Sequence, residues 1–363
     1  MKKRILILAN NATGLYDFRN ELLLRLLKDY EVHVSLPDEE EVPEIAQEGC
    51  MVHHTQLERR GMNPVKDAGL MLRYLRLLRK VKPDIVLTYT IKPNIYGSLC
   101  CRILRIPYLV NITGLGSAFE HEGMLRKLVV FLYRTALKKA SCVFFQNAKN
   151  RDVFTGFGIK GKKDRLVCGS GVNLDRHVFE EYPEEQEPVR LLFVGRIMKE
   201  KGIDELLYAA EKIRQEFPDV IFELVGSYED DYKELIEEKQ KAGIVQFTGY
   251  QKIIHPYYKR AAAAVMPSYH EGMSNVILEA AATGRPVLAS AIPGCKEGFD
   301  DGITGIGFIP RDKEAFYEAV RRFLTLSREE RKEMGKNARK KMEKEFDRGF
   351  VVESYIEEIQ KII

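Results

Sequence analysis

The chain has 363 residues, of which 45% are hydrophobic and 30% are charged, and its formal net charge is +4. This length exceeds what one hydrophobic core ordinarily organises, so two soluble domains are expected. No apolar run approaches the roughly 18–20 residues that span a bilayer, which excludes a membrane-spanning helix. The six cysteines have neither C-x-x-C nor metal-ligand spacing, which indicates reduced thiols in a cytoplasmic protein rather than disulfides or a zinc site.

Charge is divided unevenly along the chain. Residues 1–180 hold 29 Lys and Arg against 19 Asp and Glu, whereas the remaining residues hold 28 against 34. A basic first half is typical of a protein that meets an anionic surface. Ordinary solvation of helix faces explains the same asymmetry equally well, so both interpretations stay open.

The first half alternates short β-branched runs with longer helical patterns. Helices are predicted at Asp17–Lys28, Lys66–Lys80 and Leu125–Lys139. Alternation of this kind predicts a parallel sheet with helices on both faces. The predicted strands of this half are Arg4–Ala9, Glu31–Leu36, Met51–Gln56, Ile85–Thr90, Tyr108–Ile112 and Cys142–Gln146.

The same alternation restarts after Val178–Pro188, an acidic, proline-punctuated stretch that is the best linker in the sequence. We expect a first domain over residues 1–180 and a second over 181–346, followed by a helix over 347–363 that can pack back on the first. The predicted strands of the second half are Val189–Val194, Val220–Val225, Val245–Thr248, Ala263–Met266 and Val287–Ser290, and its closing helices lie around Lys313–Leu326 and Arg328–Phe346. The expected fold class is α/β, with two Rossmann-like doubly wound domains facing a cleft.

Two loops of the first half place glycine beside polar side chains. The loop N-N-A-T-G after the first strand contains Gly14, which lets the backbone approach a ligand, although the G-x-G-x-x-G fingerprint is absent. An ordinary strand–helix turn is the alternative there. The loop over residues 111–123 offers polar groups for an acceptor, namely Asn111, Thr113, Ser117 and His121. A lone histidine is more often structural than catalytic, and that alternative stays open for His121.

A cationic pair follows the first strand of the second half. The stretch G-R-I-M-K-E-K-G places Arg196 and Lys201 five residues apart, just beyond the strand end. Arginine offers a rigid fork for phosphate oxygens and lysine a mobile point charge, so the pair suits a diphosphate whose charge rises as it leaves. Surface charge at a helix start is the alternative, but cations there oppose the helix dipole.

The most informative stretch is Pro267–Ala282, which reads P-S-Y-H-E-G-M-S-N-V-I-L-E-A-A-A. A buried strand precedes it, and Ser274 and Asn275 commonly begin helices. The free N–H groups and the dipole of a helix start favour phosphate. Glu271 in the loop and Glu279 about one turn into the helix only accept hydrogen bonds, so they suit the hydroxyls of a ribose or a sugar.

Other common catalytic arrangements are absent from the sequence. There is no Ser-His-Asp order, no nucleophile elbow and no second metal-binding histidine beside His270 and Glu271. The acidic pairs Asp230-Asp231 and Asp300-Asp301 lie in turn sequences rather than at strand ends, so no obligatory metal is expected. His270 remains a candidate sugar contact.

The E-x7-E spacing of Glu271 and Glu279, the upstream G-R-x4-K-G and the two Rossmann-like halves closely resemble retaining group 1 glycosyltransferases of GT-B architecture. This resemblance covers essentially the whole chain. It implies catalysis by Glu271, Arg196 and Lys201, with Glu271 on the donor sugar and the two cations on its diphosphate. It further implies Glu279 on the ribose, a nucleotide sugar as substrate, and neither cofactor nor metal. The other donor-binding positions that match the family are Gly14, Gly195, Gly226, Tyr250, His270, Gly272, Met273, Ser274, Asn275 and Val276.

Three further motifs resemble one subgroup of that family, namely F-R-N-E-L-L at 18–23, K-P-N-I-Y-G at 92–97 and N-I-T-G-L-G at 111–116. Its members extend polyprenyl-diphosphate-linked sugars for surface polysaccharide or glycan assembly. The likeness implies transfer of an N-acetylhexosamine or hexose from a UDP-sugar to a lipid-linked saccharide, at the cytoplasmic, inner face of the cell membrane. Many family members carry a histidine where this chain has G-L-G, so the family gives no role to His121.

An anionic membrane surface is a further partner that the sequence brings into view. Lys66–Lys82 and Leu125–Lys139 combine leucines with basic side chains. Such helices can lie on anionic lipid, gaining about 1 kcal/mol for each basic residue near the surface. The alternative, that their leucines belong to the core, has at least equal weight.

Two other functions remain open from the sequence. A UDP-sugar epimerase on the same architecture needs acid–base side chains at the sugar carbon, and these are sparse in the first-half loops. The second is a protein that binds a nucleotide sugar without turning it over, against which the intact set of Glu271, Glu279, Arg196 and Lys201 argues. No aromatic-interleaved basic strand or helix-turn-helix signal supports nucleic-acid binding.

Overall fold

A computed structural model describes residues 2–37, 42–58, 63–115, 119, 123–184 and 188–363. The chain forms two compact units, the first from Met1–Ser170 with Gly349–Ile363 and the second from Gly171–Arg348. A search of the described residues finds no helix with the length and apolarity to cross a bilayer.

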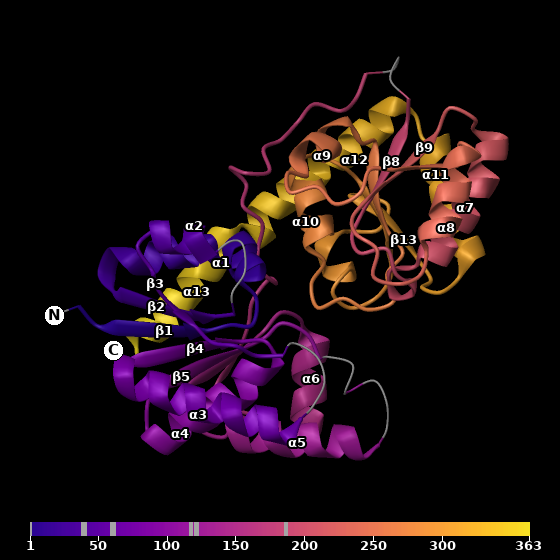
Figure 1. Ribbon diagram of the computed structural model, residues 1–363. Helices are drawn as coiled ribbons and strands as arrows, with labels where there is room; N and C mark the ends of the chain where they lie inside the picture. The colour runs from indigo at the N-terminus through magenta and orange to yellow at the C-terminus, as the bar shows by residue number, and fades with distance from the viewer. Residues whose placement is uncertain (1, 38–41, 59–62, 116–118, 120–122, 185–187) are drawn as a thin grey trace. The chain divides into compact units, whose positions relative to one another are not determined.

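Within the described residues, seven parallel strands form the sheet of the first unit, in the order β3-β2-β1-β4-β5-β6-β7 (Figure 1). This order, which reverses direction beside β1, is that of a doubly wound sheet, where ligands bind beyond the carboxyl ends of the strands. The strands are β1 (Arg4–Leu8), β2 (Glu31–Leu36), β3 (Met51–His54), β4 (Ile85–Tyr89), β5 (Tyr108–Ile112), β6 (Cys142–Phe145) and β7 (Asp164–Leu166).

Helices cover both faces of this sheet, because its central strands are apolar on both sides. One face packs against α1 and α13, through Leu22 and Tyr355 among others, and the other packs against α3, α4 and α5, through Tyr74 and Tyr133 among others (Figure 1). The helices are α1 (Ala12–Asp29), α2 (Val42–Gln47), α3 (Pro64–Val81), the π-helical turn η1 (Pro93–Gly97), α4 (Ser98–Leu104), α5 (Met124–Leu137), α6 (Ala148–Gly156) and α13 (Arg348–Gln360).

Helix α13 is far from the other elements of the first unit in sequence but belongs to the same core. Val351, Ile356 and Ile359 are buried with the residues of β1, β2 and α1. The Tyr355 hydroxyl donates a hydrogen bond to Oδ1 of Asn111 on β5. The end of the chain therefore completes the core that its beginning starts.

The second unit repeats the architecture with a parallel sheet in the order β10-β9-β8-β11-β12-β13. Its strands are β8 (Arg190–Val194), β9 (Ile221–Val225), β10 (Val245–Phe247), β11 (Ala263–Met266), β12 (Val287–Ser290) and β13 (Gly305–Phe308). Its helices are η3 (Lys199–Lys201), α7 (Ile203–Glu216), α8 (Lys233–Lys241), α9 (His255–Arg260), α10 (Asn275–Ala282), η4 (Lys296–Gly298), α11 (Lys313–Thr325), α12 (Arg328–Lys341) and the π-helical turn η5 (Met342–Phe346).

The stretch predicted as a linker, as far as it is described, belongs to the second unit. Arg285 is fully buried there and donates hydrogen bonds to the backbone carbonyls of Tyr258, Lys259, Glu180 and Glu181. Burial lowers the pKa of this guanidinium to about 10. Because these bonds hold residues 180 and 181 against α9, the boundary lies at Ser170–Gly171 rather than at the predicted residue 180.

Most predicted strands lie within two residues of observed ones, but β7 and β13 were missed. Strand β13 reads G-I-G-F, and glycine is depleted in strands, while β7 is a three-residue polar edge strand. Helix α1 begins at Ala12 rather than at Asp17, because Asn11 caps it by accepting a hydrogen bond from the backbone N–H of Gly14 at 3.1 Å. The predicted glycine loop is therefore the first turn of a helix.

Candidate active site

The stretch between β11 and α10 holds the two predicted glutamates. Helix α10 begins at Asn275, with Ser274 in extended conformation at the capping position. As far as the structure describes this region, the Ser274 side chain accepts no hydrogen bond from the first N–H groups of the helix. Those N–H groups and the positive end of the dipole are thus available to an anionic oxygen.

Glu271 and Lys201 lie together although 70 residues separate them. Lys201 Nζ is 2.5 Å from Glu271 Oε1, and the two side chains are only 19% and 13% exposed. The pair brings the loop after β8 to the loop before α10. A lysine held at this position can also reach a phosphate that binds at the start of α10.

Backbone contacts fix these two loops against each other. Gly202 has a φ of +72°, and a Cβ atom there would lie 2.1 Å from the carbonyl oxygen of Pro267, so only glycine fits. The Tyr269 N–H donates to the carbonyl of Glu200 at 2.9 Å, and the Tyr269 hydroxyl donates to Glu205 Oε1 at 2.8 Å. The position of Glu271 is therefore determined by both loops.

Arg196 does not join the pair of Lys201 and Glu271. Its Nη1 lies 2.8 Å from Glu229 Oε2, and half of its side chain is exposed. An exposed ion pair of this kind contributes only about 0–1 kcal/mol, so an incoming diphosphate can take the place of Glu229 at little cost.

Glu279 lies in the second turn of α10 and is held by side chains from other elements. The hydroxyl of the buried Tyr258 on α9 donates to its Oε2 at 3.0 Å. His177 Nε2 is 3.9 Å from its Oε1. Burial, followed by the charge of Arg176, lowers the pKa of His177 to about 3, so this histidine is neutral at physiological pH and makes no ion pair with Glu279.

Sequence reasoning missed Tyr258 and His177, because neither stands in a recognisable spacing with Glu279. The only nearby signal is the run H-P-Y-Y at 255–258, which ordinarily indicates a short helix rather than a site. Their contacts with Glu279 join α10 to α9 and to the segment before β8, which are far apart in the sequence.

Of the remaining predicted donor positions, Gly14 lies in the first turn of α1 in the first unit, and the others follow the carboxyl ends of β8, β9, β10 and β11 in the second unit. A Cβ atom on Gly226 would lie 1.8 Å from the carbonyl oxygen of Gly195, so the exits of β8 and β9 touch through their backbones. Tyr250 is 66% exposed after β10, and His270 is exposed and accepts a hydrogen bond from Arg311 Nη2 at 3.2 Å. Met273 and Ser274 are buried, whereas Gly272, Asn275 and Val276 are partly exposed.

Comparison with known proteins assigns both parts of the chain. A family model described as glycosyl transferases group 1 matches residues 176–341, and one described as glycosyl transferase 4-like matches residues 4–147. An alpha-D-kanosaminyltransferase of Streptomyces kanamyceticus is 31% identical over 262 residues, which cover 67% of each protein. The chain belongs to the group 1 glycosyltransferases. Membership favours a sugar transferase over the epimerase that the sequence left open.

One further relative and one solved structure each match 99% of this glycosyltransferase. The N,N'-diacetylbacillosaminyl-diphospho-undecaprenol alpha-1,3-N-acetylgalactosaminyltransferase of Campylobacter jejuni is 25% identical over 380 residues, 99% of each chain. The crystal structure of Anabaena HepE in complex with UDP and glucose has a TM-score of 0.81 at 18% identity, over 99% of this chain and 100% of that one. The structural likeness confirms the predicted GT-B fold.

In the first unit, the structure corrects one of the four predicted acceptor contacts, Asn111. Asn111 is buried on β5, where its amide donates to the carbonyl of Thr88 at 3.0 Å and its Oδ1 accepts from Tyr355. These bonds commit Asn111 to the fold rather than to an acceptor. Thr113 follows β5 and is partly exposed, while Ser117 and His121 lie outside the described residues.

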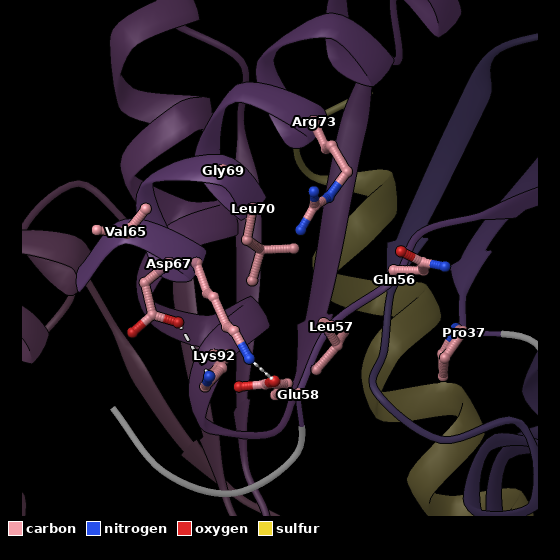
Figure 2. A pocket seen from close by; sticks show the side chains of 11 residues that line it. Pro37, Gln56, Leu57, Glu58, Val65, Asp67, Gly69, Leu70, Arg73 and Lys92 are labelled. Carbon is pink, nitrogen blue, oxygen red and sulfur yellow. Dashed lines mark hydrogen bonds and ion pairs between the residues drawn. The ribbon is translucent and has the colours of Figure 1, made fainter. Parts of the chain in front are cut away.

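A pocket of about 650 Å³ opens at the carboxyl ends of β2, β3 and β4, beside α3 (Figure 2). Lys92 Nζ is 2.9 Å from Asp67 Oδ1 on its wall, and both side chains are at least 90% buried. The Tyr96 hydroxyl donates to the other oxygen of Asp67 at 2.9 Å. Figure 2 shows Arg73 pointing into the hollow above Leu70.

The polar and apolar groups of this pocket suit a saccharide. Lys92 has two N–H groups beyond the one that Asp67 accepts, and the Arg73 guanidinium makes no ion pair with any other described residue. Gln56 and Glu58 add polar groups, and Leu57 and Leu70 add apolar surface for the C–H face of a sugar ring. Sequence reasoning did not find the pocket, because its walls come from four separate segments.

A search of the described residues for a metal site found no group of three or more His, Cys, Asp or Glu that could hold an ion. Metal independence remains a prediction from the turn-like settings of the acidic pairs.

Proposed function

We propose that this glycosyltransferase moves an N-acetylhexosamine or hexose from a UDP-sugar to a polyprenyl-diphosphate-linked saccharide, with retention of the anomeric configuration and without a metal or cofactor. The observation that carries the proposal is the meeting of Lys201 and Glu271 beside the open start of α10, with Glu279 one turn further along. This arrangement offers positive groups to a diphosphate and carboxylates to hydroxyls on either side of it.

In the proposed mechanism the protein stabilises the leaving diphosphate. As the bond between the anomeric carbon and the UDP oxygen breaks, Lys201, Arg196 and the N–H groups of α10 meet the growing negative charge. The acceptor oxygen bonds to the anomeric carbon on the face that UDP leaves, which retains the configuration. The acceptor proton passes to an oxygen of the leaving phosphate, so no protein base is needed.

The two glutamates position the donor in this mechanism. Glu271, fixed by Lys201 and by the two joined loops, accepts hydrogen bonds from the donor sugar. Glu279, oriented by the Tyr258 hydroxyl, accepts from the ribose. His270, Tyr250 and the backbone at Gly195, Gly226 and 272–276 complete the proposed donor contacts of the second unit.

Relatives support the nature of the substrates. UDP and glucose are named in the Anabaena HepE structure, and the Campylobacter relative is named for a diphospho-undecaprenol-linked acceptor. We assign the acceptor saccharide to the pocket of Lys92 and Arg73, with Thr113 as a further contact. A lipid-linked acceptor would place the enzyme at the inner face of the cell membrane, which makes an anionic membrane surface a proposed partner.

A thermal-shift experiment tests the donor site. A ligand at 100 times its dissociation constant stabilises a protein by about 2.7 kcal/mol, so UDP is expected to raise the melting temperature more than GDP does. Glu279→Gln keeps an acceptor for Tyr258 but loses the charge, and it should weaken UDP binding about tenfold or more. Glu234→Gln, on the exposed side of α8, is the matched control.

Two outcomes would contradict the assignment. The donor site is misplaced if no nucleotide shifts the melting temperature, or if Glu279→Gln binds UDP as the wild type does. Glu271→Gln should bind UDP normally and lose turnover, and wild-type turnover would remove the role of its charge.

A further inference from the structure

Helix α5 exposes large apolar side chains. Met124, Leu125, Leu128 and Phe131 are 87%, 52%, 45% and 64% exposed. Scattered single apolar side chains are normal on a protein surface, but four within eight consecutive residues form a patch.

The helical period separates this patch from the face of α5 that builds the core. Met124, Leu128 and Phe131 are spaced four and three residues apart and therefore lie in one row, with Leu125 beside it. The opposite face is buried against the sheet of the first unit through Val129, Val130, Tyr133, Ala136 and Leu137. The helix is therefore apolar on two faces, and nothing in the described chain covers the outer one.

Basic side chains surround the outer face. Lys127 lies on α5 between Met124 and Phe131, and Lys138 and Lys139 directly follow the helix, all three exposed. No other described residue forms an ion pair with these three lysines. Residues 63–140, which include α3, α4 and α5, carry fourteen Lys and Arg against four Asp and Glu.

The neighbouring helices of this layer also expose apolar side chains. Figure 1 shows α3, α4 and α5 along one face of the first sheet, and α4 contacts both of the others. Leu72 on α3 and Ile103 on α4 are 55% and 60% exposed. The helices of the opposite face differ, since the exposed positions of α13 include Glu353 and Glu357. Exposed apolar groups and excess positive charge therefore coincide on only one of these two faces.

We propose that the outer face of α5 docks on an anionic lipid bilayer. Met124, Leu128 and Phe131 enter the boundary between headgroups and acyl chains, and Lys127, Lys138 and Lys139 meet lipid phosphates. The combination of an apolar row with flanking lysines fits a charged interface better than it fits a second apolar protein surface. This inference deepens the proposed function. It rests on that function only for the lipid-linked acceptor, which would bring the enzyme to a membrane.

Vesicle sedimentation with the full-length protein tests the docking face. The wild type should pellet with phosphatidylcholine vesicles that contain phosphatidylglycerol, less so at high salt and least with phosphatidylcholine alone. The double variant Leu128→Ser/Phe131→Ser should bind the anionic vesicles at least about tenfold more weakly than the wild type does. Leu24→Ser, at an exposed position of α1 on the opposite face, is the matched control and should bind as the wild type does.

The charge is tested by Lys127→Glu/Lys138→Glu, which should also lose binding to the anionic vesicles while its thermal unfolding stays unchanged. The proposal is overturned if the wild type does not sediment with anionic vesicles, or if the Leu128→Ser/Phe131→Ser variant binds them as the wild type does. A wild-type dimer that this variant converts to a monomer would assign the face to a second copy of the chain instead. Because the assay contains neither nucleotide nor acceptor, its failure is distinguishable from failure of donor binding.

Discussion

At the scale of single residues, the surroundings of Glu279 show how buried neighbours set the chemistry of a partly exposed carboxylate. Tyr258 is fully buried, and its hydroxyl has one direction in which to donate, so it orients the carboxylate. Burial keeps His177 neutral, so this histidine places no positive charge beside Glu279.

The low pKa of His177 predicts acid sensitivity. Its folded value of about 3 lies below the ordinary 6.5, so the unfolded chain takes up the proton first. The stability that neutral His177 contributes is therefore present above pH 6.5 and is lost as the pH falls towards 3. The slope approaches about 1.4 kcal/mol for each pH unit.

His177→Gln should flatten this loss between pH 6.5 and 4, as measured by urea unfolding at a series of pH values. His54→Gln, at an exposed position, is the control. Equal slopes for the wild type and His177→Gln would show that the histidine is not buried as described.

At the scale of elements, α3 has two different tasks. Leu70, Tyr74 and Leu78 bury one side of it in the core of the first unit. Asp67, on its first turns, accepts from Lys92 and Tyr96 and so holds the wall of the pocket in place. The same helix therefore supports the sheet and shapes a binding pocket.

Removing the Arg73 guanidinium should weaken binding of the acceptor and leave binding of the donor unchanged. Arg73→Ala is expected to raise the KM for a polyprenyl-diphosphate-linked saccharide about tenfold, because a charge-assisted hydrogen bond is lost. The KM for the UDP-sugar should not change. Arg76→Ala, three residues further along α3 and outside the pocket, is the matched control for lost surface charge. A rise in both KM values, or equal effects of the two variants, would exclude the pocket as the acceptor site.

At the scale of the whole molecule, one unit is continuous in the sequence and the other is not. The second unit is continuous from Gly171 to Arg348, whereas the first is completed by residues from the far end. The free energy of unfolding of such a domain is only about 5–15 kcal/mol, so the loss of a few large buried side chains can unfold it.

A chain that ends at Arg348 should lose the folded first unit. It lacks Val351, Tyr355, Ile356 and Ile359, and each such side chain contributes about 1.5–3 kcal/mol when fully buried. Their sum is comparable to the stability of an entire domain. Calorimetry of the truncated chain should show the transition of the second unit alone, and two unchanged transitions would contradict the assignment of α13.

Local patterns in the sequence allowed much of the fold to be predicted. Strands such as β5, β11 and β12 were predicted at their observed bounds, because each is a short, mainly apolar run with clear ends. The start of α10 at Asn275 was predicted for a similar reason, since Ser and Asn begin helices. Strand β13 was missed because its burial depends on neighbours rather than on its own glycines.

The sequence by itself determined the α/β alternation, the two-domain α/β class and the candidate donor residues from Arg196 to Glu279. These depend on residue types at short spacing, which local physics constrains. Only the tertiary structure decided that Lys201 meets Glu271, that Tyr258 orients Glu279 and that Asn111 serves the fold. It also decided where the units divide and which face of α5 is left uncovered. Those features are contacts between residues far apart in the chain, and no local pattern encodes which distant side chain will fill a given space.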